Sequence, residues 1–153
     1  SERFDLVKKI TKNSQNNFLF FYCPSKIVFL YKKYFKNEIN GLDFSDVSFH
    51  PMERQSLINV IEQSKVIIDI NHSSQVGLTM RTIEMIGAKK KIITTNIEVV
   101  NYDFYRPENI LVFTNSTSLD DINRFIKTPY NELCDNIYKK YSIESWIKQL
   151  IIL

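Results

Sequence analysis

Five short apolar runs, each bounded by turn residues, constrain the fold of this chain more than any other feature. Each run is rich in β-branched or aromatic side chains and is apolar on both faces, which is typical of parallel strands covered on two sides. Helical patterns separate the runs, so the sequence predicts an α/β fold: a three-layer, mostly parallel Rossmann-like sheet with helices on both faces. The predicted strands are residues 17–22, 47–50, 66–70, 91–95 and 110–113.

Helices are predicted where apolar residues recur at intervals of three or four. The pattern of residues 26–36 is the weakest, because this segment is heavily aromatic. After the last strand, Ser118 opens a capping box, and Ser142 starts a final helix. Thr128 and Pro129 give a cap followed by a proline at the first helical position. The predicted helices before the last strand are residues 4–12, 26–36, 52–63 and 78–88, and Thr128 leads into another at 130–140.

Length and composition exclude several classes of protein. The 153 residues fit one domain, and 44% hydrophobic residues argue against disorder. A net charge of +3 is too small to indicate nucleic-acid binding. The two cysteines, Cys23 and Cys134, and the two histidines, His50 and His72, have no metal-ligand spacing. No apolar run approaches the roughly 20 residues of a membrane span, so we expect a cytoplasmic protein without a transmembrane segment.

Glycine is scarce, which excludes two phosphate-binding motifs. The chain has only Gly41, Gly77 and Gly87. A P-loop needs two glycines with a following lysine, and a dinucleotide fingerprint needs three within six positions. Neither motif exists in this sequence.

The loop at residues 71–79 is the first candidate binding site, because it links a predicted strand to a helix N-terminus. Unpaired N–H groups and the helix dipole favour an anion there, Gly77 permits a close backbone approach, and Thr79 adds a hydroxyl. An ordinary turn capped by Thr79 explains the same residues. His72 is a candidate for proton transfer or contact with a sugar hydroxyl, and a structural turn histidine is the alternative.

Two further groups adjoin this loop in the predicted fold. Arg81 and Glu84 share one helix face, where a carboxylate can accept two hydrogen bonds from a vicinal diol such as ribose. A surface ion pair worth about 0.3 kcal/mol is the alternative. Thr94 and Thr95 end the next strand, beside the first loop, and Asn96 is placed to cap the following helix. Both ligand contact and simple capping remain open for this loop.

Two more segments have plain structural interpretations. The aromatic cluster at residues 102–107 either walls a pocket for a base or belongs to the core, and core is the commoner role. The lysines at 89–91 are expected at a solvated helix exit, where cations offset the dipole.

Residues 77–96 read GLTMRTIEMIGAKKKIITTN. This stretch resembles the donor-binding half of GT-B glycosyltransferases, in particular the bacterial lipopolysaccharide and capsular-polysaccharide group. The shared pattern is a glycine loop, a helix carrying Glu, a closing Gly and a strand ending in small hydroxyl residues. The likeness extends upstream through residues 67–70 and downstream through 102–105 to 109–110, and Trp146 agrees with it. About a third of the chain carries the specific part.

The resemblance implies an enzyme domain that binds a nucleotide-activated sugar as donor substrate, without another cofactor or a bound metal. Glu84 would accept the ribose hydroxyls, backbone amides of the turn 77–79 would hold the diphosphate, and Arg81 would add positive charge. The catalytic residue stays open, with His72 as a candidate. The residues expected to bind the nucleotide sugar are Ser74, Gly77, Leu78, Thr79, Arg81, Glu84, Thr94 and Thr95.

The chain also departs from the family pattern. GT-B enzymes have two domains, whereas 153 residues provide one, so the N-terminal acceptor domain is missing and we expect a fragment with little or no activity. The sequence starts at a helix where relatives have a strand, which leaves open whether the sheet lacks its first strand. The acceptor would be a saccharide or a lipid-linked molecule. A peripheral position at the inner membrane face stays open, although no strongly basic amphipathic helix stands out.

Two alternative functions remain. A nucleotide-sugar epimerase of the two-domain type would share the donor-site architecture. A non-catalytic α/β binding module is the other alternative, although the paired acidic residues of receiver-like domains are lacking beside Asp69. The sugar, the nucleotide, the acceptor and the stereochemical course are not disclosed by the sequence.

Overall fold

The structure is a computed structural model of the chain, and it describes residues 2–12, 14, 16–36, 39, 41–71 and 77–151. The chain divides into two compact units, Ser1–Val60 and Ile61–Leu153. Each unit is described by itself, and helix α3 (Arg54–Gln63) crosses from one to the other. The interpretation of all 153 residues as one domain stays a prediction.

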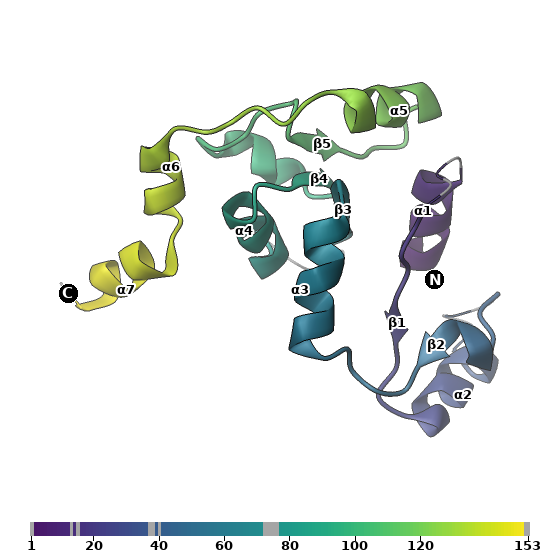
Figure 1. The fold of residues 1–153 in the computed structure, drawn as a ribbon. Helices are drawn as coiled ribbons and strands as arrows, with labels where there is room; N and C mark the ends of the chain where they lie inside the picture. Colours follow the sequence, from purple (N-terminus) through teal and green to yellow (C-terminus); the bar gives the residue numbers. More distant parts are fainter. Residues whose placement is uncertain are drawn as a thin grey trace. The chain divides into compact units, whose positions relative to one another are not determined.

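The first unit contains a small parallel sheet of two strands, in which Phe21 of β1 pairs with Val47 of β2. Its core consists of Phe4, Cys23, Phe29 and Leu42. Helix α2 begins behind Ser25, whose hydroxyl accepts a hydrogen bond from the Ile27 amide. The elements are α1 (Glu2–Thr11), β1 (Phe21–Tyr22), α2 (Lys26–Tyr34), the 3-10 helix η1 (Phe44–Asp46) and β2 (Val47–Ser48). Figure 1 labels all of them except η1.

The second unit is built on a three-stranded parallel sheet in the order β3-β4-β5. Its central strand β4 is buried along its whole length, as expected for a strand covered on both faces. The strands are β3 (Val66–Asp69), β4 (Lys91–Thr94) and β5 (Ile110–Val112). The helices are α4 (Met80–Gly87), the 3-10 helix η2 (Ile97–Asn101), α5 (Leu119–Lys127), α6 (Asp135–Lys140) and α7 (Ile143–Ile151).

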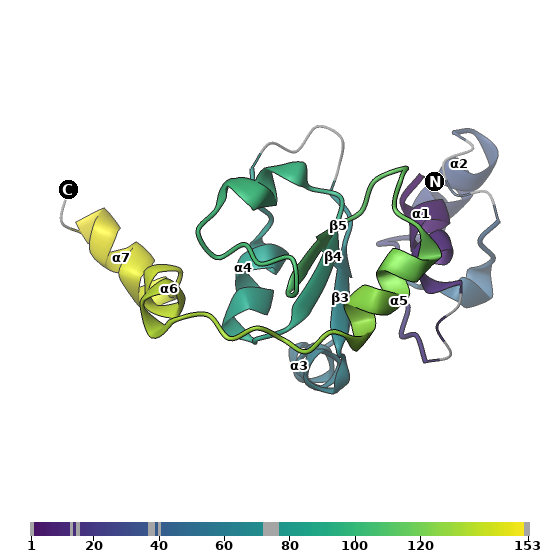
Figure 2. The same ribbon diagram turned by 90° about the horizontal axis from the view of Figure 1, so that it is seen from above.

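Helices cover both faces of this sheet. Ile110 and Val112 of β5 pack into one cluster with Ile86 of α4. The intervening Leu111 lines a hollow on the other side together with Phe125 of α5. Figures 1 and 2 show α4 and α5 on opposite sides of the three strands. The unit therefore has three layers, in the order helix, sheet, helix.

The prediction of an α/β fold with parallel strands is confirmed, and all five strands occur inside their predicted ranges. They are shorter than predicted and lie in two sheets of two and three strands. Only Phe21 and Tyr22 of the run 17–22 form a strand, and Phe18, Leu19 and Phe20 before them are exposed. The predicted helices 4–12, 26–36, 52–63 and 78–88 are confirmed, with ends that differ by at most two residues.

The helix predicted for residues 130–140 is wrong in its first half, because α6 begins only at Asp135. The buried Asn109 side chain takes both backbone groups of Asn131: its Nδ2 donates to Asn131 O at 2.6 Å, and its Oδ1 accepts from Asn131 N at 2.7 Å. Thr128 caps the end of α5 by donating to Arg124 O, instead of starting the next helix. A contact distant in the sequence thus overrides a local helix signal.

The solvated helix exit predicted at residues 89–91 is wrong for Lys91. This residue opens the buried strand β4, and its Nζ donates to the carbonyl oxygens of Phe125 and Thr128 at the end of α5. Burial lowers the pKa of Lys91 below its ordinary value. The cation offsets the negative end of the α5 dipole from within the core. Lys89 does stay exposed at the end of α4.

Among the described residues, no helix is both long enough and apolar enough to span a membrane.

Candidate functional site

The carboxyl ends of β3 and β4 lie side by side, since Asp69 pairs with Thr94 in the parallel register. Ligands of open parallel sheets bind outside this edge. A hydrogen bond joins the segments that follow the two strands: the Asn71 amide after β3 donates to Thr95 Oγ1 after β4 at 3.0 Å. Next to it, Thr94 Oγ1 accepts from the Asn96 amide at 3.1 Å. The predicted adjacency of the two loops is confirmed for these residues.

Helix α4 is joined to this edge through the Asp69 carboxylate. Thr79 is the N-cap of α4, and its hydroxyl donates to Asp69 Oδ2 while accepting from the Thr82 amide at 3.1 Å. Thr82 Oγ1 also donates to Asp69 Oδ2, at 3.3 Å. Strand β3 and the first turn of α4 are thereby locked together. The expected capping role of Thr79 is confirmed, with a partner that the sequence analysis did not name.

The turn before α4 contains a glycine in the left-handed region. Gly77 has φ +86°, and among the described residues no atom lies within 4 Å of a Cβ placed at this position. This conformation favours glycine, because L side chains rarely adopt it. Asn96 fixes the turn, because its Nδ2 donates to Gly77 O at 2.8 Å. Asn96 also caps η2 through the Glu98 amide, as predicted.

Arg81 and Glu84 are partly exposed residues of α4, whereas Thr82, Met85 and Ile86 are buried. Arg81 Nη1 stands 3.7 Å from Glu84 Oε2, and the Glu84 side chain is 54% exposed. The i,i+3 ion pair predicted as the plain alternative is present. The Glu84 carboxylate remains accessible to a diol, and its role in ribose binding stays a prediction.

The other predicted site residues differ in accessibility. Thr94 is 1% exposed, and Leu78 is partly buried against the apolar cluster around Ile86. Both residues shape the turns of this edge through packing, and contact with a ligand stays a prediction for them. Thr95 is half-buried. His72 and Ser74 lie outside the described residues.

The charges at this edge decide what it can bind. The helix dipole of α4 favours an anion at Thr79, but the Asp69 carboxylate already supplies negative charge there. A phosphate at this turn would therefore depend on Arg81 and on backbone amides more than on the dipole. Sequence analysis did not assign Asp69 to the site. The available signal was an acidic residue at the last position of a strand, followed by hydroxyl residues at a helix start.

The aromatic segment 102–107 belongs mainly to the core. Phe104 is 1% exposed and stacks on Tyr102 with ring centroids 5.3 Å apart. Asp103 receives hydrogen bonds from Lys140 Nζ at 2.6 Å and from the Tyr141 hydroxyl at 2.7 Å. These bonds hold the pKa of Asp103 below its usual range. Burial and the Asp103 hydrogen bond raise the pKa of Tyr141 to about 12.

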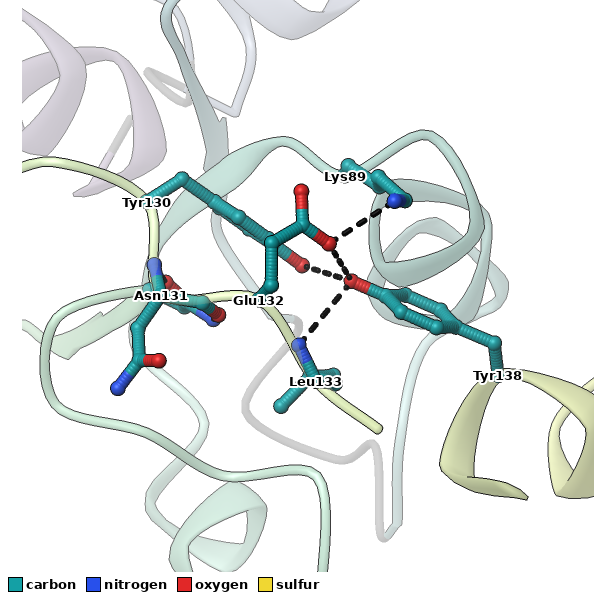
Figure 3. A network of polar contacts seen from close by, with 7 residues as sticks. Lys89, Tyr130, Asn131, Glu132, Leu133 and Tyr138 are labelled. Carbon is teal, nitrogen blue, oxygen red and sulfur yellow. Dashed lines mark hydrogen bonds and ion pairs between the residues drawn. The ribbon is translucent and has the colours of Figure 1, made fainter. Parts of the chain in front are cut away.

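A second polar network joins α4 to the segment before α6 (Figure 3). The Tyr138 hydroxyl donates to Glu132 Oε2 at 3.1 Å and accepts from the Leu133 amide at 3.3 Å. Lys89 Nζ lies 2.9 Å from Glu132 Oε2, and Tyr130 and Tyr138 join their hydroxyls at 3.3 Å. Burial raises the pKa of Tyr130. The network links Tyr138 of α6 to the segment before that helix and, through Glu132, to Lys89 at the end of α4.

Two hollows of the second unit lie away from the β3–β4 edge. One, of about 530 Å³, lies beside α5 and is lined by Leu111, Arg124 and Phe125 among others. The other, of about 380 Å³, lies between α4 and α6 beside the network of Figure 3. Of the residues predicted to bind the nucleotide sugar, those that the structure describes do not line either of these two hollows.

Comparison with models of protein families, with curated proteins and with solved structures finds no match for this chain. Among the residues that the structure describes, no group of three or more His, Cys, Asp or Glu side chains is arranged to hold a metal ion. The chemistry of the site is therefore interpreted from its own geometry.

Proposed function

We propose that this chain is the donor-binding domain of a GT-B glycosyltransferase of the bacterial lipopolysaccharide and capsular-polysaccharide type. One observation carries the proposal: the polar carboxyl edge of β3 and β4 meets the Gly77 turn and the first turn of α4. Such an edge is where parallel α/β sheets bind ligands. The proposal includes the finer architecture, a three-layer, mostly parallel Rossmann-like sheet with helices on both faces.

In the proposed complex, the Glu84 carboxylate accepts hydrogen bonds from the two ribose hydroxyls of a nucleotide-activated sugar. Arg81, now 3.7 Å from Glu84, turns toward the diphosphate, which is also held by amides of the turn 77–79. Thr95 borders the same edge, and Ser74 is kept as a predicted contact of the nucleotide sugar. The proposal places donor binding in the cytoplasm and assigns the acceptor, a saccharide or a lipid-linked molecule, to a second domain.

The reaction proposed for the complete enzyme is glycosyl transfer. The bond between the anomeric carbon and the diphosphate oxygen breaks, and a bond from that carbon to an acceptor hydroxyl oxygen forms. The acceptor proton passes to a base, for which His72 is a candidate, and the diphosphate leaves with the bonding electrons. The residues of this domain act by positioning the donor and by offsetting the charge of the leaving group.

The test is calorimetric titration of the 153-residue chain with UDP-, GDP- and ADP-sugars. We expect one nucleotide class to bind, and Glu84→Gln to weaken its binding about 10- to 100-fold, since hydrogen bonds to a charged group contribute about 1.5–3 kcal/mol. The same substitution changes the free energy of unfolding by only about 0.3 kcal/mol, the worth of an exposed i,i+3 pair. Glu144→Gln, at the exposed start of α7, is the matched control and leaves binding unchanged.

Failure of all three nucleotide classes to bind would contradict the proposal, as would equal affinities of the parent and Glu84→Gln. Product analysis separates the alternatives that share a donor site. An epimerase converts the sugar with donor alone, whereas a transferase needs an acceptor and its second domain. Binding without either reaction, in a chain supplied with that domain and an acceptor, points to a non-catalytic module.

A further inference from the structure

Helix α2 places its apolar residues on the outside. At 100° per residue, six residues follow one another around the helix over an arc of about 160°. All six are exposed, with Phe35 at 81% and Ile27 at 77%, whereas Phe29 on the opposite side is fully buried. The arc consists of Ile27, Val28, Leu30, Tyr31, Tyr34 and Phe35, and is called here the α2 apolar face.

Lysines border the α2 apolar face on both sides. Around the helix, Lys32 and Lys36 follow Val28, and Lys26 precedes Leu30. All three lysines are exposed. A fourth, Lys33, is half-buried and pairs with Asp43 at 2.8 Å. From residue 16 to residue 36 the chain contains these four lysines and no aspartate or glutamate.

We propose that the α2 apolar face docks on an anionic lipid surface. A short helix with aromatic and aliphatic residues on one face and lysines along its borders fits the interface plane of a membrane, where rings enter the headgroup level and cations meet lipid phosphates. The local charge complements such a surface. A protein partner fits less well, because lysine is depleted at protein–protein interfaces.

This proposal stands apart from the proposed donor site, because it involves other residues on the first unit. The apolar periodicity of residues 26–36 predicted a helix but did not indicate which side is exposed, since its buried side is also aromatic through Phe29. Its outward apolar arc becomes evident only from the exposure of the individual side chains. The lysines on either side then distinguish it from a plain apolar patch.

The test is co-sedimentation of the 153-residue chain with vesicles of phosphatidylcholine alone and of phosphatidylcholine mixed with phosphatidylglycerol. We expect binding to the mixed vesicles, weakened by added salt, and at least about tenfold weaker binding to the neutral ones. Ile27→Glu and Phe35→Glu each lower binding at least about tenfold, because a carboxylate enters the apolar face. Lys32→Glu with Lys36→Glu removes the preference for the anionic lipid.

The matched control is Ile97→Glu, which places the same charge at an exposed isoleucine of the second unit and leaves vesicle binding unchanged. Circular dichroism checks that each variant is folded. If a glutamate variant does not fold, Ile27→Ser repeats the test without introducing a charge. Binding that no α2 substitution weakens overturns the proposal, and so does absence of binding to anionic vesicles. A self-association that Phe35→Glu abolishes, without vesicle binding, identifies a second copy as the occupant and also overturns it.

Discussion

Helices α2 and α4 have nearly the same length and each begins behind a hydroxyl side chain, yet they use their apolar residues in opposite ways. α4 buries Thr82, Met85 and Ile86 against its sheet and leaves Arg81 and Glu84 outside. α2 buries only Phe29 and exposes the six residues of its apolar face. An apolar pattern therefore shows that a helix has a face to cover, but not whether the chain itself covers it.

The sharpest test of this difference is a pair of phenylalanines on the α2 segment. Phe29→Ala should lower the free energy of unfolding by about 4 kcal/mol, because it empties a fully buried site. Phe35→Ala should change it by less than about 0.5 kcal/mol, because that ring is exposed. Urea denaturation measures both values. Equal losses would mean that the apolar face is covered within the chain.

A matched pair of methionines tests α4. Met85→Ala should cost about 3 kcal/mol, since Met85 is 1% exposed in the core. Met80→Ala, five residues earlier and largely exposed, should cost less than about 0.5 kcal/mol. The comparison again uses urea denaturation. A large effect of Met80→Ala would contradict the described orientation of α4.

The two N-caps should differ in a smaller but measurable way. Thr79→Ala should destabilise the protein by about 2 kcal/mol, because it removes a cap and a hydrogen bond to Asp69 together. Ser25→Ala should cost about 0.5–1 kcal/mol, since only the bond to the Ile27 amide is lost. Thermal unfolding of the two variants provides the measurement, and Thr79→Ser, which keeps the hydroxyl, serves as control. A cost of Ser25→Ala above that of Thr79→Ala would contradict the lock at Asp69.

The smallest effect concerns pH and a residue that lies outside both helices. The folded pKa of Tyr141 is about 12, above its ordinary value of 10.0, so between these values the unfolded chain loses the proton first. Stability held by the neutral tyrosine is present below pH 10 and falls as pH rises toward 12. Ultraviolet absorbance of tyrosinate should therefore show a late titration that Tyr141→Phe removes. An unchanged titration curve in this variant would exclude the shift.

Local sequence signals predicted the parts of the fold that local chemistry determines. The β-branched runs before Asp69 and Thr94 identified β3 and β4, and the hydroxyl residues Thr79 and Ser118 identified the starts of α4 and α5. The position of Asn96 identified its cap. In each case the residue and its partner lie within a few positions of one another.

Contacts between distant residues escaped prediction. Nothing near Lys91 indicated that its ammonium would reach the end of α5, thirty-four residues or more away in the sequence. The helix expected from Thr128 onward was lost to Asn109, twenty-two residues before its partner Asn131. Asp69 belongs to the candidate site because it accepts hydrogen bonds from the hydroxyls of Thr79 and Thr82, ten and thirteen residues later in the sequence. Spacing within one element cannot reveal such partners, because the fold brings them together.

The paired bonds between Asn109 and Asn131 also have a consequence for how this chain tolerates change. The Asn109 side-chain amide bonds both the N–H and the C=O of Asn131, and this fixes which residue lies beside the start of β5. A shift of the chain by one residue would leave the buried Asn109 donor and acceptor without partners. Insertions in the exposed stretch at 114–117 would be absorbed before that point. Asn109 thus keeps the position of Asn131 fixed, and with it the start of the segment that leads to α6, whatever the length of the loop at 114–117.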